Sequence, residues 1–318
     1  MGSIKHYLKE IGRGAVGSRS LDVVKAEDLM AQVLDGQVTD LEIGGFALAM
    51  RIKGETVDEL IGFAQSVQAR CLSIPSDKPV VVIPSYNGAR RLPNLVPLLA
   101  LRLAQDGVRV LVHGPRHDPS RVTSADIFAA LGLPPASSAE CVHEFWSRRE
   151  PAFITTEALS PPLQRLLDVR WVVGLRNSGH TVAKLLQPIS GAPTLRLASH
   201  THPEFGKLMA DYAERTAADL MLLRGTEGEA VADPRRCPKI DQWLSGQWRE
   251  DLSCPAQEGS LAELPILPRQ IDAACTAVYT QAVASGEQPA PTPLERQVDL
   301  VLRALVQIET APLRVRQA

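Results

Sequence analysis

The chain lacks any long apolar run. None of its apolar segments reaches the roughly 18 residues that a helix needs to cross a bilayer. The first residues, Met1 to His6, have no apolar core of the kind that signal peptides carry. We therefore expect a cytoplasmic protein with no membrane partner.

Cysteine is scarce, and its pattern excludes two classes of small stabilised domain. The five cysteines are far apart and form no C-x-x-C motif. An odd number of scattered cysteines indicates neither a disulfide framework nor a zinc site. Two pairs of histidines, His113 with His117 and His200 with His202, have no cysteine or carboxylate at the spacing that would complete a metal-ligand set.

The chain also lacks an excess of charge of either sign. Its formal net charge of −2 argues against a uniformly basic nucleic-acid binder and leaves room only for a local basic patch. Among the basic residues, 26 are arginine and 8 are lysine. The flat fork of arginine suits carboxylate and phosphate, although such a bias also follows from genome composition.

The first 70 residues carry the periodicity of about four helices. Thr39 with Glu42, and Thr56 with Glu59, have capping-box spacing at the start of the third and fourth helices. The pair Gly44–Gly45 inside the third helix costs roughly 1 kcal/mol per glycine, so we expect close packing there. A tightly packed helical face is a natural dimer surface.

From residue 80 onward, strand patterns alternate with helix patterns. Two β-branched runs, at 80–83 and 108–112, flank a helix-length apolar segment, which indicates a βαβ unit. Further strands are expected at 152–155, 194–198 and 218–223, and irregular structure at 233–268. This alternation predicts an α/β fold with a mostly parallel sheet.

The segment from Ile74 to Pro79 is predicted to be a stiff linker, because its two prolines lack the backbone donors that a helix or central strand needs. We therefore predict a helical domain over residues 1–74, with a contribution from helices around 160–190. The α/β domain is predicted over residues 79–318. Within the first domain, Ser20 is expected to cap a helix from Leu21 to Leu34.

The loop after the first strand is the first place to look for function. Ligands of such folds lie at the carboxyl ends of strands and at helix N-termini, where free N–H groups favour anions. Arg90 and Arg91 follow this loop, and Arg116 and Arg121 are expected at the end of the next strand, so together they predict an anion-binding rim. The alternative is that these arginines are solvated or paired with nearby aspartates, Asp118 and Asp126.

Four segments of the chain carry a recognisable pattern: Ile83–Arg90, Ser124–Gly132, Gly174–Ser178 and Gly225–Glu229. Together they resemble the anthranilate phosphoribosyltransferase family, most closely its bacterial YbiB branch. The resemblance implies the nucleoside phosphorylase/phosphoribosyltransferase fold, with a small helical domain and a larger α/β domain. It also implies a homodimer that binds DNA or other nucleic acid with little sequence specificity, and we expect the dimer to form through the helical domain.

The loop departs from the pattern of the catalytic family. That family has Gly-Thr-Gly-Gly-Asp here, and its glycines let backbone N–H groups close around the diphosphate of phosphoribosyl pyrophosphate. Proline has no N–H, and tyrosine is bulky, so we interpret the segment as a vestigial phosphate loop. The matching residues are Pro84, Ser85, Tyr86, Asn87 and Gly88, followed by Asn94 in place of a phosphate-contacting segment.

Two further positions correspond to ligand-binding residues of the family. Glu227 and Glu229 are the nearest counterparts of its magnesium-binding pair, with altered spacing. Arg176 matches an arginine that faces the acceptor, so it is expected to bind an anion. We expect no cofactor, and Mg²⁺ only if the protein is an enzyme.

Three hypotheses follow, and the first is favoured. The first is a nucleic-acid-binding homodimer on a degraded phosphoribosyltransferase fold, in which Tyr86 stacks on a base. The second is an active phosphoribosyl or pentosyl transferase with Mg²⁺ and an unidentified acceptor. The third is a protein that senses a metabolite or binds a partner in the cleft between its domains, without chemistry. Arg170 beside Trp171 is typical of the solvent-facing edge of an amphipathic helix. The expected nucleic-acid or anion-binding residues are Tyr86, Asn87, Arg90, Arg91, Arg116, Arg121 and Arg176.

Overall fold

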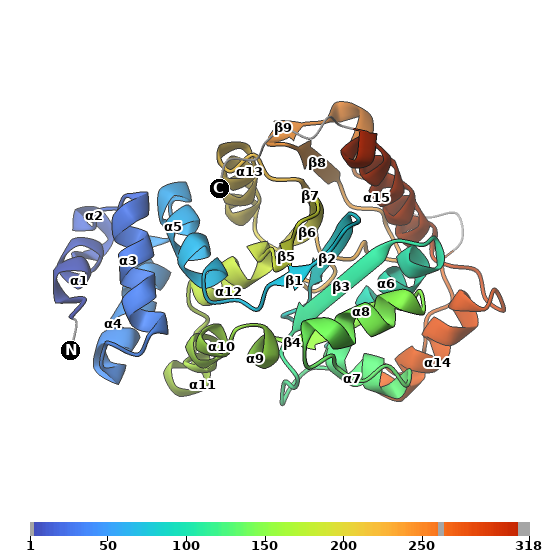
Figure 1. Cartoon of the computed structure of the whole chain (residues 1–318), viewed down its shortest axis with the longest axis horizontal. Coiled ribbons are helices and arrows are strands. Elements are labelled where there is room, and N and C mark those ends of the chain that lie inside the picture. The colour runs from blue at the N-terminus through green and yellow to red at the C-terminus, as the bar shows by residue number, and fades with distance from the viewer. Residues whose placement is uncertain (1–2, 260–263, 311–318) are drawn as a thin grey trace.

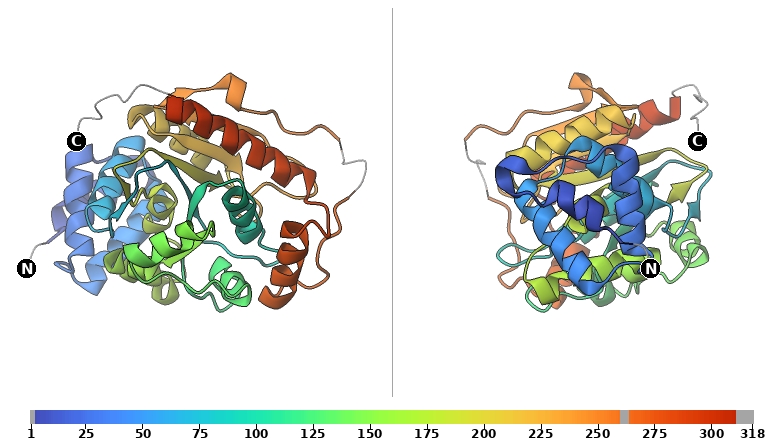
Figure 2. Two further views of the ribbon diagram at one scale, coloured as in Figure 1. Left: turned by 45° about the vertical axis from the view of Figure 1, so that its right-hand side comes forward. Right: turned by 90° about the vertical axis from the view of Figure 1, so that its left-hand side faces the viewer.

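The amino-terminal part of the chain is a helical bundle that lies beside a larger part built on a central sheet (Figure 1). The structure, a computed structural model, describes residues 3–259 and 264–310. The left view of Figure 2 shows the bundle at one end of the molecule, and the right view looks onto that end. Its helices are α1 (Lys5–Ile11), α2 (Gly14–Gly17), α3 (Val23–Leu34), α4 (Asp40–Lys53) and α5 (Val57–Gln68).

Two of these helices begin as predicted. The Thr39 and Thr56 side chains each accept a hydrogen bond from the backbone N–H three residues on, and Glu42 and Glu59 accept from the N–H of the capping residues. Both predicted capping boxes are therefore confirmed. Helix α3 begins two residues later than expected, because the side chain of Asp22 caps it in place of Ser20.

Glu59 ties three helices of the bundle together. Its fully buried carboxylate accepts the backbone N–H of Leu21 before α3 and the ammonium of Lys53 at the end of α4, at 2.9 and 2.6 Å. A buried carboxylate needs such partners, because an uncompensated charge inside a protein is costly. The link fixes the end of α4, which faces the sheet domain.

The central sheet has seven strands in the order β4-β3-β2-β6-β7-β8-β9. The first five are parallel and the last two are antiparallel, which confirms the predicted α/β fold with a mostly parallel sheet. The stretch expected to be irregular contains the two antiparallel strands, and that expectation was wrong there. The strands are β2 (Val80–Pro84), β3 (Arg109–Gly114), β4 (Ala152–Thr155), β6 (Thr194–His200), β7 (Leu220–Arg224), β8 (Ile240–Leu244) and β9 (Gln247–Trp248), with β1 (Ile74–Pro75) paired separately to β5 (Ile189–Ser190).

Helices cover both faces of the sheet, which explains why its central strands are continuously apolar. Side chains alternate along β2, so that Val80 and Val82 join the core shared with the bundle, and Val81 and Ile83 join the opposite core. The first core includes α8 (Ala139–Ser147), α9 (Thr156–Leu159), α10 (Pro161–Asp168), α12 (Gly179–Val182) and α13 (Pro203–Arg215). The second includes α6 (Val96–Gln105), α7 (Ser124–Ala130), α14 (Ala273–Ala284) and α15 (Thr292–Thr310).

Helices from the middle of the chain pack on the bundle: α10 contacts α3, and α12 contacts α5. The short helix α11 (Arg170–Val173) follows α10 and precedes α12 in the sequence. Among the helices that the structure describes, none is long and apolar enough to cross a membrane.

Candidate functional site

A tight turn after β7 packs against the loop that follows β2. Glu227 and Gly228 both have positive φ, at 51° and 89°, and the Glu229 N–H donates to the Thr226 carbonyl at 2.9 Å. A Cβ on Gly228 would lie 1.9 Å from Asn87 Nδ2, so only glycine lets the turn approach this closely. The turn therefore lies directly against the loop.

Two glutamates of this turn accept the N–H groups of the loop. Glu229 Oε1 accepts from Asn87 at 2.7 Å and from Gly88 at 2.5 Å, and Glu227 Oε2 accepts from Arg90 at 2.5 Å. Convergent backbone N–H groups are an anion site, and here an internal carboxylate occupies it. Glu229 is 2% exposed, and this burial raises the pKa of its carboxyl above the ordinary value.

Side chains reinforce the contact between loop and turn. The Gly228 carbonyl accepts from Asn87 Nδ2 at 2.7 Å and from Ser199 Oγ at 2.6 Å. The guanidinium of Arg176 donates to Asn87 Oδ1 and to the Tyr86 carbonyl. Burial, together with the positive charges of Arg170 and Arg121, lowers the pKa of Arg176 to about 10. Arg176 thus holds the loop as well as facing the adjacent cleft.

Tyr86 lies inside the protein. It is 4% exposed, and its hydroxyl forms hydrogen bonds with His113 Nδ1 at 2.9 Å and Thr156 Oγ1 at 3.3 Å. Burial lowers the pKa of His113 to about 3, so the imidazole is neutral at ordinary pH. The expectation that Tyr86 stacks on a base was wrong, because its ring is packed in the core shared with the bundle.

The other residues of the vestigial phosphate loop are also internal. Pro84 ends β2 and is buried, and Ser85 Oγ lies 2.7 Å from Ser124 Oγ. Asn94 donates to the same serine hydroxyl at 3.0 Å and accepts the N–H of Val96 at 3.1 Å at the start of α6. These polar groups are satisfied within the protein.

The structure brings together the two loops that carry the four predicted arginines. Ala89 and Val122 exchange two backbone hydrogen bonds of 2.8 and 3.0 Å, so the loops after β2 and β3 run side by side. Gly88 makes this approach possible, since a Cβ there would lie 2.8 Å from the Val122 carbonyl oxygen. Arg90, Arg91 and Arg116 are exposed, and Arg121 is half-buried.

The acidic partners proposed as the alternative are engaged elsewhere. Asp118 pairs with Arg170, and Asp126 caps α7 together with Thr123. Within residues 3–259 and 264–310, no carboxylate lies in ion-pair distance of the Arg90, Arg91, Arg116 or Arg121 guanidinium.

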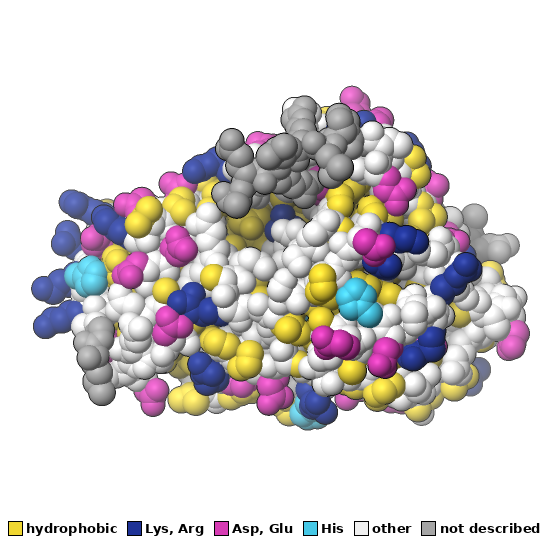
Figure 3. All heavy atoms as spheres, in the orientation of Figure 1, with side chains coloured by type: hydrophobic (Ala, Val, Ile, Leu, Met, Phe, Trp, Pro, Cys, Tyr) yellow, Lys and Arg dark blue, Asp and Glu magenta, His cyan; other side chains and the backbone are white. Residues whose placement is uncertain are grey.

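A basic groove of about 980 Å³ extends this edge past the end of β7. Two of its cations are neutralised, because Arg235 pairs with Asp233 and Lys239 with Asp241. Sequence reasoning missed the groove because it lies in the stretch expected to be irregular, although the basic string at 235–239 was a signal. On the face of the molecule seen in Figure 3, acidic and basic side chains are interspersed over most of the surface. The basic residues of the groove are Arg91, Arg224, Arg235, Arg236 and Lys239.

A separate cleft of about 630 Å³ lies between the bundle and the sheet domain. Lys184 faces it and donates to the Ser199 carbonyl at 3.1 Å, and burial lowers the pKa of this lysine to about 8. Glu227 and Glu229 point into the loop, and the described residues contain no group of three His, Cys, Asp or Glu side chains suited to a metal ion. One carboxylate oxygen of each glutamate is therefore engaged by the loop rather than free for a Mg²⁺ ion.

Comparison with known proteins identifies the family. Residues 5–71 match the helical bundle domain of the glycosyl transferase family. The chain is 38% identical over 320 residues to the uncharacterized protein YbiB of Escherichia coli (strain K12), with 99% of each chain covered. It is 28% identical to the anthranilate phosphoribosyltransferase of Paramagnetospirillum magneticum over 295 residues, covering 89% of this chain and 82% of the other. The chain belongs to the anthranilate phosphoribosyltransferase-like family.

Solved structures of anthranilate phosphoribosyltransferases share the fold. The enzyme from Thermus thermophilus superposes with a TM-score of 0.69 at 20% identity, covering 95% of this chain and 88% of that one. The Saccharomyces cerevisiae enzyme in complex with PRPP and Mg gives 0.60 at 13% identity, covering 96% and 97%. The resemblance read from the sequence is therefore confirmed for family and fold.

Proposed function

We propose that this protein is a cytoplasmic homodimer that binds nucleic acid with little sequence preference and does not transfer phosphoribosyl groups. The observation that carries the proposal is the position of Glu229, whose carboxylate fills the anion site of the loop while exposed arginines line the same sheet edge. Phosphates of the nucleic-acid backbone carry no sequence information, so a rim of arginines binds them without discriminating between bases.

Binding of a diphosphate at the loop would require Glu229 to leave. Its carboxylate accepts two backbone N–H groups, and hydrogen bonds to charged groups are each worth roughly 1.5–3 kcal/mol. The incoming phosphate would also meet Pro84, which has no N–H to offer. Both features favour a protein in which this loop is structural.

The cations at the same edge suit a chain of phosphates. Arg90 and Arg91 come from the loop after β2, Arg116 from the loop after β3, and Arg224 and Arg236 from β7 and the segment beyond it. These five arginines are exposed, and each presents a fork that matches a phosphate. Several phosphates spaced along a strand can be contacted from one edge of the sheet.

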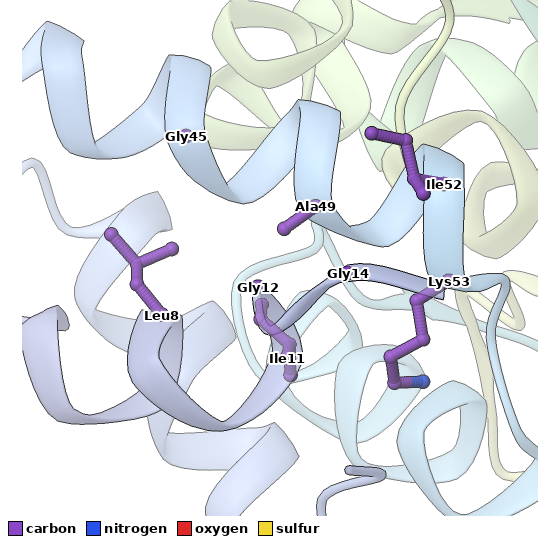
Figure 4. Close-up of a pocket in the computed structure, with 8 residues that line it drawn as sticks. All are labelled: Leu8, Ile11, Gly12, Gly14, Gly45, Ala49, Ile52 and Lys53. Carbon is purple, nitrogen blue, oxygen red and sulfur yellow. The ribbon is translucent and has the colours of Figure 1, made fainter. Parts of the chain in front are cut away.

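We propose that the second copy packs on the outer face of α4. Leu41, Leu48 and Ile52 recur at helical spacing on this face and are 86%, 43% and 68% exposed. Beside them, an apolar groove of about 280 Å³ runs between α1 and α4, where Gly45 lies against Leu8 (Figure 4). Exposed apolar patches of this kind mark interaction sites.

Light scattering after size exclusion tests the dimer. The L41D/L48D variant places two carboxylates on the proposed interface and is expected to elute as a monomer, whereas V24D, at another exposed apolar position of the bundle, is expected to leave the dimer intact. A wild-type protein that is monomeric at micromolar concentration would contradict the proposed dimer.

Fluorescence anisotropy with a labelled DNA of roughly 30 nucleotides tests the nucleic-acid interface. The R90A/R91A variant removes two exposed cations of the rim and is expected to weaken binding about tenfold at low salt. The matched control is K78A/R149A, which removes two exposed cations near the starts of β2 and β4, at the opposite edge of the sheet. An unchanged Kd for R90A/R91A would overturn the assignment of the interface.

The alternative is a transferase that acts on a phosphoribosyl or pentosyl donor with Mg²⁺. The family includes anthranilate phosphoribosyltransferases, and Arg176 and Lys184 face the cleft between the bundle and the sheet domain. Calorimetry with phosphoribosyl pyrophosphate and Mg²⁺ at millimolar concentration separates the two. Saturable heat would favour the transferase, and none would reject it.

A further inference from the structure

One aromatic side chain is exposed close to the arginine rim. The chain has four tryptophans, of which Trp146 and Trp243 are buried and donate their indole N–H groups inside the protein. Trp171 and Trp248 are 52% and 48% exposed. Because a half-exposed indole leaves a large apolar surface in water, its surroundings decide what it can bind.

A chain of contacts holds Trp171 in place. The guanidinium carbon of Arg170 lies 3.9 Å from the centroid of the Trp171 ring, a cation–π contact. Arg170 in turn pairs with Asp118, which is buried and also accepts the N–H and the hydroxyl of Ser120, both at 2.9 Å. One face of the indole is therefore backed by a fixed cation, and about half of the side chain faces solvent.

The Trp171 platform lies next to the loop that carries Arg116 and Arg121. Pro115 and His117 of that loop line the same small hollow as Arg170 and Trp171. Arg121 also lies near enough to Arg176 for its charge to act on it. An apolar ring beside these cations complements a base with its flanking phosphates better than it complements an apolar peptide.

We propose that an unpaired nucleobase stacks on the exposed surface of Trp171 while Arg116 and Arg121 contact the phosphates beside it. The inference rests on the proposed function and adds a preference for single-stranded nucleic acid. In a duplex, both faces of each base are already stacked on neighbouring bases, so only a single strand offers a free face. Sequence tolerance is retained, because every base has a π-face.

Three oligonucleotides of one length separate stacking from charge: oligothymidylate, its abasic counterpart with the same phosphates, and a duplex. For the W171A variant we expect oligothymidylate to bind roughly tenfold more weakly, with less than about a twofold change for the other two. The W171F variant, which keeps a smaller ring, is expected to fall between W171A and wild type. W248A, which removes the other exposed tryptophan, is expected to bind all three as wild type does.

The W171A and W171F variants are expected to keep the fold intact, because no residue of α11 is buried. An equal loss for oligothymidylate and for the abasic chain would overturn stacking, as would an unchanged Kd for W171A. In both cases wild-type binding would still support the nucleic-acid proposal. Wild-type protein that binds none of the three oligonucleotides would overturn the proposed function and the stacking together.

Intrinsic fluorescence gives a second readout of the same contact. Stacking of thymine on Trp171 is expected to quench tryptophan emission in wild type and in W248F, and the quenching is expected to disappear in W171F. Quenching that persists in W171F would place the base elsewhere and overturn the inference.

Discussion

Two regions at the same edge of the sheet treat anions in opposite ways. The loop after β2 turns its backbone N–H groups inward, where Glu229 and Glu227 accept them. The loop after β3 and the segment after β7 leave Arg116, Arg224 and Arg236 exposed, with no carboxylate in ion-pair distance within the described residues. The first region is satisfied by the protein itself, and the second is open to a partner.

The two regions would bind different kinds of anion. In this fold, a free N–H cradle would bind a small diphosphate at one point, whereas side-chain cations spread along an edge bind an extended polyanion. In this protein Glu229 accepts the N–H groups of the cradle, whereas within the described residues no carboxylate pairs with Arg116, Arg224 or Arg236. This difference supports the proposal that the edge binds a long chain of phosphates rather than a single nucleotide.

Reversing charge in the open region should have the largest effect. The R116E/R224E/R236E variant replaces three exposed cations with carboxylates, and we expect nucleic-acid affinity to fall on the order of 100-fold at low salt. Anisotropy titration measures the change. R19E/K78E/R149E, which reverses three exposed cations away from this edge, is the control, and a similar loss in both variants would mean that only net charge matters.

Removing the carboxylate from the closed region should cost stability rather than affinity. In E229A the buried N–H groups of Asn87 and Gly88 lose their acceptor, so we expect the free energy of unfolding to fall by about 3 kcal/mol in urea titration. E229Q keeps an accepting oxygen and should lose much less. Equal stability of E229A and wild type would show that the glutamate does not hold the loop.

The buried histidines His113 and His180 predict a graded effect of pH on stability. Burial lowers the pKa of His113 and of His180 to about 3, so the unfolded chain takes up these protons first as the pH falls below about 6.5. Their contribution to stability is present above that pH and is lost toward pH 3, at up to about 1.4 kcal/mol per pH unit for each histidine.

Urea titrations between pH 7 and 4 measure this slope. H113Q is expected to flatten the pH dependence, and H113Q/H180Q to flatten it about twice as much, whatever each variant does to stability at pH 7. Identical slopes in wild type and in both variants would contradict the neutral, buried state of these rings.

The features predicted correctly from the sequence are those set by local patterns. The capping boxes at Thr39 and Thr56 and the apolar strand Val80–Pro84 depend on residues within a few positions of each other. Asp22 displaced Ser20 as a cap by only two residues, a choice that local propensity does not resolve. Strands β8 and β9 were missed because polar residues interrupt both of them and leave no apolar run.

The site was harder to predict because its contacts are distant in sequence. Glu227 and Glu229 lie 137 to 142 residues away from the loop residues whose N–H groups they accept. The sequence alone therefore indicated only an altered metal-binding pair and not the contact with the loop. Tyr86 was expected in solvent because polar loops are usually exposed, whereas its hydroxyl has buried partners in β3 and α9. Arg90, Arg91 and Arg116 are exposed after strands that end at one edge, and their role in binding an anion stays a prediction.

A salt titration tests the central claim most directly. A labelled single-stranded DNA is titrated with wild-type protein at several salt concentrations, and log K is plotted against log salt. If four or more arginines neutralise phosphates, the slope should be about −3 or steeper, at roughly −0.7 per phosphate on a single strand. No binding even at low salt, or binding that ignores salt, would contradict a rim of arginines that holds nucleic acid.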